Sequence, residues 1–276
     1  MREYTEPTPI DLQAFSTGRI LKESWEICTK YFGALVMPMF ILMIPGVIAA
    51  MIIDGKLGES IGNFVGGILM PIASMGINRS LIMLKREGTT PTLGTTFDHG
   101  CDYWWRGIRI GIVSGFYFLL LILVIIALIL PGALLLSQSG IAGGFLLTLG
   151  VVASIWLSIW FVTRASLAIP SMADSSLDAF PAFAAGWKIA KENVAHTRTV
   201  VLALGGLGFA AFLFVIIVIA ITSAVFVAPG DGSGEAALGL LLFPALVLYA
   251  AGLTFAYVAI NLTYQALKPA PTEETQ

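Results

Sequence analysis

The sequence has very little charge for its length. Only 12% of its 276 residues are charged and 57% are hydrophobic, whereas a soluble domain averages about 25% charged residues. A chain of this size cannot bury so much apolar surface in a core of its own, so lipid must be the solvent for much of it. The composition therefore excludes an ordinary soluble domain and predicts an integral membrane protein.

Cysteine and histidine are also scarce. Two cysteines, Cys28 and Cys101, exclude a disulfide framework. Two histidines leave little for acid–base catalysis, and no serine-hydrolase elbow, zinc-protease helix or phosphate-binding loop is present. The run Asp98-His99-Gly100-Cys101-Asp102 matches no zinc-ligand spacing. We therefore expect no enzyme, no metal site and no cofactor.

Long uncharged runs locate the membrane spans. Residues 110–163 carry no charge, which is enough for two crossings of roughly 20 residues each, and turn-forming residues near 136–141 divide them. Backbone groups in lipid must be satisfied within their own segment, so the spans must be helices. The expected fold is all-α and polytopic, with six transmembrane helices at about 32–53, 61–84, 110–135, 141–168, 198–228 and 236–267.

The basic residues orient these helices. Of the 15 lysines and arginines, only Lys56 falls in a connection on the side opposite to both termini. The positive-inside rule then places the N-terminus and the C-terminus in the cytoplasm. We expect a multi-pass protein of the plasma membrane, which in bacteria is the inner membrane.

An amphipathic pattern occurs three times, each time just before a long apolar run. Apolar residues stand at i, i+4, i+7 and i+11 in the stretches 21–32, 97–108 and 183–194. A second match, I-N-x-[ST] followed by L-K, joins the stretches 77–85 and 260–268. The sequence therefore predicts three pseudo-repeated units, each an amphipathic interfacial helix followed by a transmembrane hairpin.

These units set the expected domain limits. We expect a single six-helix membrane domain at 16–268, with units at about 16–92, 93–177 and 178–268. A cytoplasmic segment (1–15) precedes it and a cytoplasmic tail (269–276) follows it. The expected partners are membrane lipids, with a membrane protein or a second copy of the chain as alternatives, and nucleic acid is not expected.

Charged and polar side chains near the spans are the candidate binding residues. Arg79 and Arg164 occupy corresponding places near the cytoplasmic ends of two spans. Each either snorkels to water or forms a structural pair, or else its guanidinium binds a lipid phosphate or an anionic substrate. Asn78 and Asn261 are the candidate polar residues inside the membrane.

The amphipathic stretches themselves have three interpretations. They lie in the headgroup plane, where their basic residues meet anionic lipid, or they dock a protein partner, or they pack on neighbouring units of the same chain. Trp25, Trp104 and Trp187 fall near the predicted cytoplasmic boundary, where indole rings are favoured. We expect these three residues to be interfacial anchors.

Three stretches carry a family resemblance. They are Ile20-Leu21-Lys22-Glu23-Ser24-Trp25-Glu26, residues 76–88 followed by Thr96-Phe97-Asp98, and Arg164 through Pro170 to Ala182, Trp187 and Asn193. In these stretches the chain resembles a group of bacterial and archaeal six-span proteins. The group includes the membrane domain of glycerophosphoryl diester phosphodiesterases and related membrane families. The resemblance implies the six-span architecture and no particular reaction.

Together these observations favour a non-enzymatic membrane protein that acts through its cytoplasmic-side amphipathic helices on lipid or protein partners. The alternative is a transporter or channel for a small or anionic solute. That alternative requires a polar cavity at mid-membrane that contains Asn78, Asn261, Arg79 or Arg164.

Overall fold

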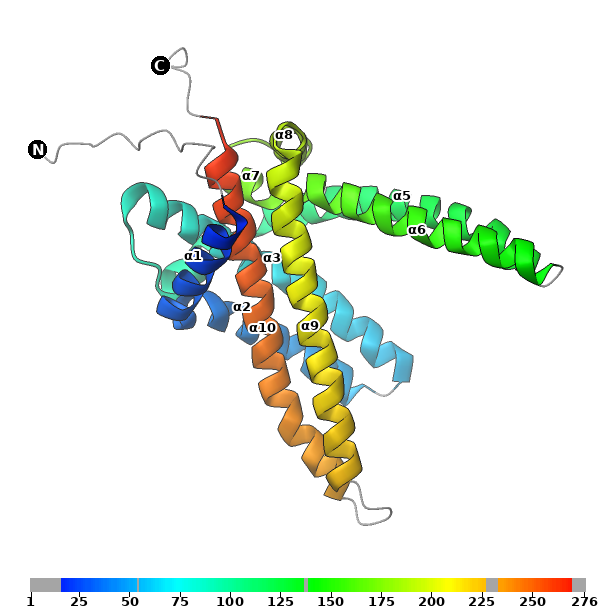
Figure 1. The fold of residues 1–276 in the computed structure, drawn as a ribbon. Helices are drawn as coiled ribbons and strands as arrows, with labels where there is room; N and C mark the ends of the chain where they lie inside the picture. Colours follow the sequence, from blue (N-terminus) through cyan, green and yellow to red (C-terminus); the bar gives the residue numbers. More distant parts are fainter. Residues whose placement is uncertain (1–15, 54, 137–138, 227–232, 270–276) are drawn as a thin grey trace, which may run out of the picture.

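The computed structural model describes residues 16–53, 55–136, 139–226 and 233–269 (Figure 1). All the regular structure in these ranges is helical, and six helices are long and apolar enough to cross a membrane. The predicted all-α polytopic fold with six spans is confirmed. The predicted N-terminal segment (1–15) and all but the first residue of the predicted tail lie outside the described ranges.

The described residues form ten helices. Their bounds are α1 Thr17–Lys30, α2 Phe32–Ile52, α3 Gly55–Glu87, α4 Leu93–Asp102, α5 Trp104–Leu136, α6 Gly140–Ala165, α7 Ala168–Asp174, α8 Ala179–Glu192, α9 Val194–Phe226 and α10 Ser233–Leu267. The spans are α2, α3, α5, α6, α9 and α10. The short helices α1, α4 and α8 each precede a hairpin of two spans, as the amphipathic pattern predicts.

One residue separates each short helix from the span that follows it. These residues are Tyr31, Tyr103 and Asn193, and all three leave the helical region of backbone angles, with ψ between 4° and 38°. The amphipathic stretch predicted at 97–108 is therefore not one surface helix. The bend at Tyr103 (φ −101°, ψ 4°) assigns Trp104 and Ile108 to the beginning of α5.

Helix α7 was not predicted: the expected span was 141–168, and no helix was expected between it and the amphipathic stretch at 183–194. The structure ends α6 at Ala165 and begins α7 at Ala168, with Leu167 (φ −85°, ψ 2°) between them. Pro170 lies in the first turn of α7, where its missing N–H costs no helical hydrogen bond. Asp174 is the last residue of α7, which packs on α3, α8 and α10.

Three hairpins extend from a common hub (Figure 1). Helices α9 and α10 run side by side, whereas the α5–α6 hairpin points away from them. We define the hub as α1, α4, α7 and α8 together with the C-terminal ends of α3 and α10. Helices α3, α7 and α10 contact one another at its centre.

The contacts between elements follow a cyclic order. Each short amphipathic helix packs on the end of the preceding hairpin: α4 on α3, α8 on α6 and α7, and α1 on α10. The second helix of each hairpin also contacts the first helix of the next, in the pairs α3 with α5, α6 with α9 and α10 with α2. Because α10 is the last helix and α1 and α2 are the first, the order closes on itself.

In two of the three hairpins, glycines allow the two helices to approach each other closely. A Cβ on Gly46 of α2 would lie 2.9 Å from the carbonyl oxygen of Gly62 on α3. A Cβ on Gly132 of α5 would lie 2.4 Å from the backbone nitrogen of Leu147 on α6. The hydrophobic effect does not favour the association of helices in lipid, because the lipid tails are as apolar as the side chains. Van der Waals contact between closely spaced backbones therefore stabilises these helix pairs.

Candidate functional site

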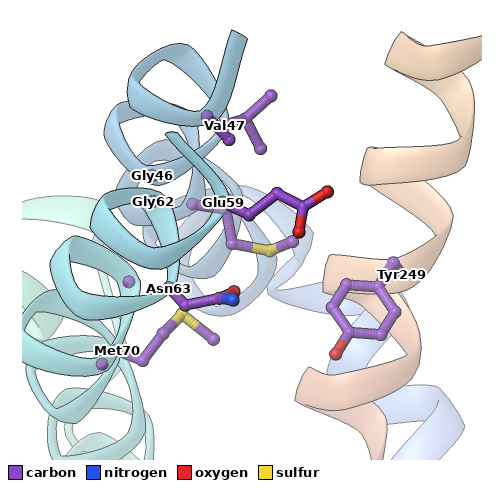
Figure 2. Close-up of a pocket in the computed structure, with 11 residues that line it drawn as sticks. Gly46, Val47, Glu59, Gly62, Asn63, Met70 and Tyr249 are labelled. Carbon is purple, nitrogen blue, oxygen red and sulfur yellow. The ribbon is translucent and has the colours of Figure 1, made fainter. Parts of the chain in front are cut away.

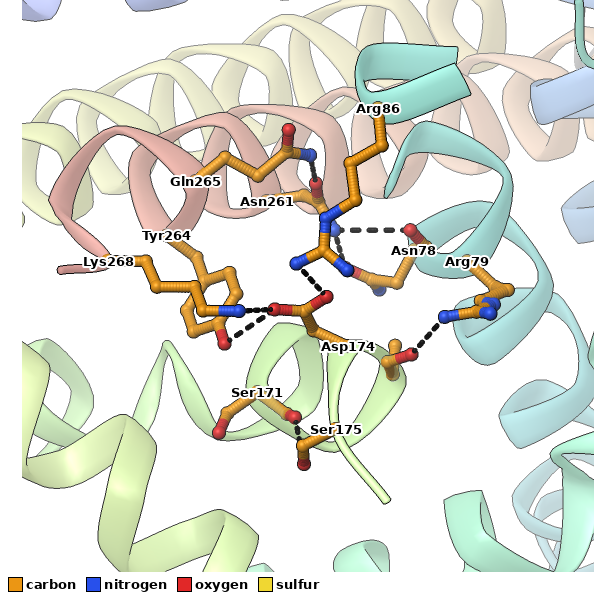
Figure 3. A network of polar contacts seen from close by, with 11 residues as sticks. Asn78, Arg79, Arg86, Ser171, Asp174, Ser175, Asn261, Tyr264, Gln265 and Lys268 are labelled. Carbon is orange, nitrogen blue, oxygen red and sulfur yellow. Dashed lines mark hydrogen bonds and ion pairs between the residues drawn. The ribbon is translucent and has the colours of Figure 1, made fainter. Parts of the chain in front are cut away.

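Asp174 lies at the centre of a polar cluster in the hub (Figure 3). It is the last residue of α7, and only 1% of its side chain is exposed. Its Oδ2 lies 2.5 Å from the Nζ of Lys268 and accepts a hydrogen bond of 3.1 Å from the hydroxyl of Tyr264. Its Oδ1 lies 2.5 Å from Nη2 of Arg86. One carboxylate thus joins α7 to the ends of α3 and α10.

The two cationic partners of Asp174 differ in their contacts. Lys268 donates a hydrogen bond to Oδ2, whereas Oδ1 accepts no hydrogen bond from a described residue, so its contact with Arg86 is ionic only. Half of the Arg86 side chain and about a third of that of Lys268 are exposed. A buried carboxylate needs such partners, because an isolated charge away from water is strongly disfavoured.

Arg79 extends this cluster toward α4. Its Nη1 donates a hydrogen bond of 3.3 Å to the carbonyl oxygen of Ala173, and its guanidinium lies 5.4 Å from the ring centroid of Tyr103. The predicted candidate therefore has partners within the protein. With Arg79, Arg86 and Lys268 around the single carboxylate of Asp174, the cluster has three cations and one anion, an excess of two positive charges.

Arg164 has a different environment. Its guanidinium lies 4.2 Å from the ring centroid of Trp160, one turn earlier on α6, in a cation–π contact. No contact among the described residues joins it to the Asp174 cluster. Arg79 and Arg164 occupy corresponding positions in the sequence, but their side chains have different partners in the structure.

Asn78 and Asn261 meet directly, although the sequence alone did not pair them. Both are fully buried, and Nδ2 of Asn261 donates a hydrogen bond of 2.7 Å to Oδ1 of Asn78. Nδ2 of Asn78 donates to the carbonyl oxygen of Ser74, and Gln265 donates to Oδ1 of Asn261. Their hydrogen-bonding groups are thus used to join α3 to α10, and Figure 3 shows the pair beside the Asp174 cluster.

The face that the short amphipathic helices bury coincides only in part with the predicted apolar stripe: Cys28, Phe183 and Ala190 of the stripe are buried, whereas Trp25 and Cys101 are exposed. On α1 the buried residues are Ile20, Ser24, Ile27 and Cys28. Small residues at the matching places let α4 and α8 lie against backbone: a Cβ on Gly100 would lie 2.3 Å from the carbonyl oxygen of Ile72, and one on Gly186 2.6 Å from that of Leu167. Packing on the preceding hairpin therefore uses the small residues and leaves part of the stripe exposed.

The three predicted anchors lie in different places. Trp25 on α1 is 64% exposed. Trp104 is half-buried and donates a hydrogen bond of 2.8 Å from Nε1 to the carbonyl oxygen of Ile68. Trp187 is half-buried in an aromatic cluster with Phe183 and other rings. On the outer surface near Trp104, the neighbouring Trp105 is 59% exposed.

A cavity of about 440 Å³ lies away from the hub, between the α2–α3 hairpin and α10 (Figure 2). Figure 2 shows Glu59 and Asn63 of α3 facing Tyr249 of α10 across it. None of the four polar residues singled out in the sequence (Asn78, Asn261, Arg79 and Arg164) lines this cavity.

The comparisons with known proteins give no relative: no family model, no curated protein and no solved structure matches the chain. The resemblance to the six-span group therefore stays a prediction, and the site must be interpreted from its own geometry.

Asp174 is not among the candidate residues predicted from the sequence. A signal was present, since Asp174 is the first acidic residue after Asp102 and follows directly on the apolar segments of the second unit. An acid at the basic end of two hairpins is a candidate partner for the cations there.

Proposed function

We propose that the protein is a non-enzymatic membrane component that binds anionic lipid through the exposed faces of α1 and α8. The observation that carries this proposal is the exposed surface of α1: Trp25 is 64% exposed, Lys22 lies one turn before it, and Arg19 and Lys30 are exposed farther around the same helix. An indole favours the headgroup layer, and each lysine or arginine near an anionic surface contributes about 1 kcal/mol.

Helix α8 supports the same proposal. Lys188 and Lys191 are exposed on it, and Phe180 at its beginning is 65% exposed. The excess positive charge of the Asp174 cluster lies in the same hub. Acidic residues such as Glu26, which lies 3.9 Å from Lys22, reduce the net charge, so the attraction to anionic lipid is moderate.

We also propose how the protein is oriented in the membrane and how its three hairpins are related. We infer that the hub and both termini face the cytoplasm of a plasma membrane, because the basic residues gather there. We also infer that the three hairpins are copies of one unit. The cyclic order in which the short helices and spans contact one another supports this inference.

The buried asparagine pair favours this role over transport. A transport path at this depth needs polar groups that are free to bind a solute. Asn78 and Asn261 instead bind each other, and both side chains are fully buried.

Thermal unfolding in nanodiscs of phosphatidylcholine, with and without phosphatidylglycerol, tests the proposal. A ligand that binds only the folded state raises the unfolding temperature, so phosphatidylglycerol should stabilise the wild-type protein. Lys22→Gln, Lys188→Gln and Lys191→Gln together should remove most of that gain. Lys56→Gln is the matched control, because Lys56 is exposed at the far end of the α2–α3 hairpin. An equal gain in all three proteins would refute the proposal.

A further inference from the structure

The cavity between the α2–α3 hairpin and α10 has one polar end. Glu59 and Asn63 lie one turn apart on α3, and Tyr249 faces them from α10 (Figure 2). Among the described residues that line the cavity, Glu59 is the only charged one. Among the described residues, neither Glu59 nor Asn63 has a hydrogen-bond or ion-pair partner. The polar end therefore offers a carboxylate, an amide and a phenol to a ligand.

The other end of the cavity is apolar and open. Gly66 and Gly67 form part of its wall, and a Cβ on either glycine would meet no atom within 4 Å. Met43 and Met70 lie beside them. From Glu59 to Met70 the helix rises about 16 Å, so the cavity is long enough for a polar head and the first part of an apolar chain.

The side chains that line the cavity determine which charge the polar head of a ligand must carry. The carboxylate of Glu59 is exposed at the polar end of the cavity, where it can accept charge-assisted hydrogen bonds from a cation that pairs with it. A metal ion is a poor fit, because Ca²⁺ takes six to eight oxygen ligands and Mg²⁺ keeps its waters, whereas most of the lining is glycine and apolar side chains. An organic ammonium group satisfies Glu59 with hydrogen bonds and leaves its apolar part for the glycine wall.

We propose that this cavity binds an amphiphile with an ammonium head, with the nitrogen at Glu59 and the chain along Gly66 and Gly67. Two sources have this chemistry: an aminophospholipid of the bilayer and a free long-chain amine. The proposal does not depend on the lipid contact proposed for α1 and α8, because the cavity lies at the opposite end of the hairpin from the hub.

Binding to the full-length protein in maltoside micelles, followed by native mass spectrometry, tests the proposal. The probes are phosphatidylethanolamine, phosphatidylglycerol with the same chains, and dodecylamine. We expect phosphatidylethanolamine or dodecylamine to bind and phosphatidylglycerol to bind at least about tenfold more weakly at this site, since phosphatidylglycerol has no ammonium group to pair with Glu59. Binding of phosphatidylethanolamine identifies the bilayer as the source, and binding of dodecylamine alone identifies a free amine.

Two variants and one control locate the site. Glu59→Gln should weaken binding of the ammonium probe about tenfold, and Gly66→Leu should block it by filling the apolar end. Glu87→Gln is the control, because Glu87 is exposed at the other end of the same helix. Glu59 is exposed, so its variant keeps the fold even if Gly66→Leu does not. Unchanged binding in Glu59→Gln, or equal binding of phosphatidylglycerol to the wild type, would overturn the proposal.

Discussion

Asp174 joins three separate parts of the chain through one buried carboxylate. Its partners Arg86, Tyr264 and Lys268 come from α3 and α10, far from it in the sequence. Sequence patterns are local, so they could mark Asp174 as an isolated acid but could not supply the partners. Those partners depend on the packing of α7 against α3 and α10, which joins segments about 90 residues apart.

Asp174→Asn should lower the free energy of unfolding by about 2 kcal/mol, the usual contribution of hydrogen bonds to a charged group. The substitution leaves Arg86 and Lys268 next to each other without a counter-ion, although their partial exposure lets them reach water. Denaturant unfolding in micelles measures the change. Asp178→Asn is the control: it breaks the more exposed pair with Arg109 and should cost about 1 kcal/mol or less. Equal losses would contradict the role given to Asp174.

The two cysteines should react very differently. Burial raises the pKa of the Cys28 thiol to about 12, and the thiolate is the reactive form. Cys28 should therefore stay unmodified by a maleimide between pH 7 and 9, because its pKa lies above that range. Cys101 is exposed and should be labelled. Peptide mass mapping checks both sites, and labelling of Cys28 in the folded protein would show that α1 is not packed on α10 as described.

At the scale of elements, charge and hydrophobicity predicted the spans well, because a lipid solvent imposes long uncharged helices. The exact ends of the helices and the faces that they bury depend on single residues. The bend at Tyr103 and the interruption at Leu167 reflect backbone angles that an apolar pattern does not encode. The buried face of α1 also differs in part from its apolar stripe, because Ser24 is fully buried and satisfies its hydroxyl by donating to the carbonyl oxygen of Ile20 on the same helix.

The contact between α3 and α10 should depend on the asparagine pair. Asn78→Leu and Asn261→Leu each leave the partner amide buried without its hydrogen bond, so each should destabilise the protein. A double-mutant cycle should give a coupling of about 1 kcal/mol, within the range measured for hydrogen bonds between membrane helices. Asn63→Leu provides a comparison on the same helix, since Asn63 is exposed and has no partner among the described residues. Zero coupling between Asn78 and Asn261 would contradict their direct contact.

At the scale of the whole molecule, the sequence could predict three similar units but not how they are placed. Sequence similarity between units says nothing about which helices touch. The cyclic packing follows from contacts made by small residues, as where Gly76 and Gly100 bring α3 and α4 together. The direction of the α5–α6 hairpin, which points away from α9 and α10 in Figure 1, has no local sequence signal at all.

On the proposed function, α1 lies in the headgroup layer with its exposed face toward anionic lipid. A nitroxide label at Trp25→Cys, in a chain with Cys101→Ser, tests it in vesicles that contain phosphatidylglycerol. Power-saturation spectroscopy with oxygen and a water-soluble nickel chelate measures the depth of the label. The label should be mobile and accessible to both reagents, as expected at headgroup depth. A label accessible only to the nickel chelate, or shielded from both reagents, would contradict the account.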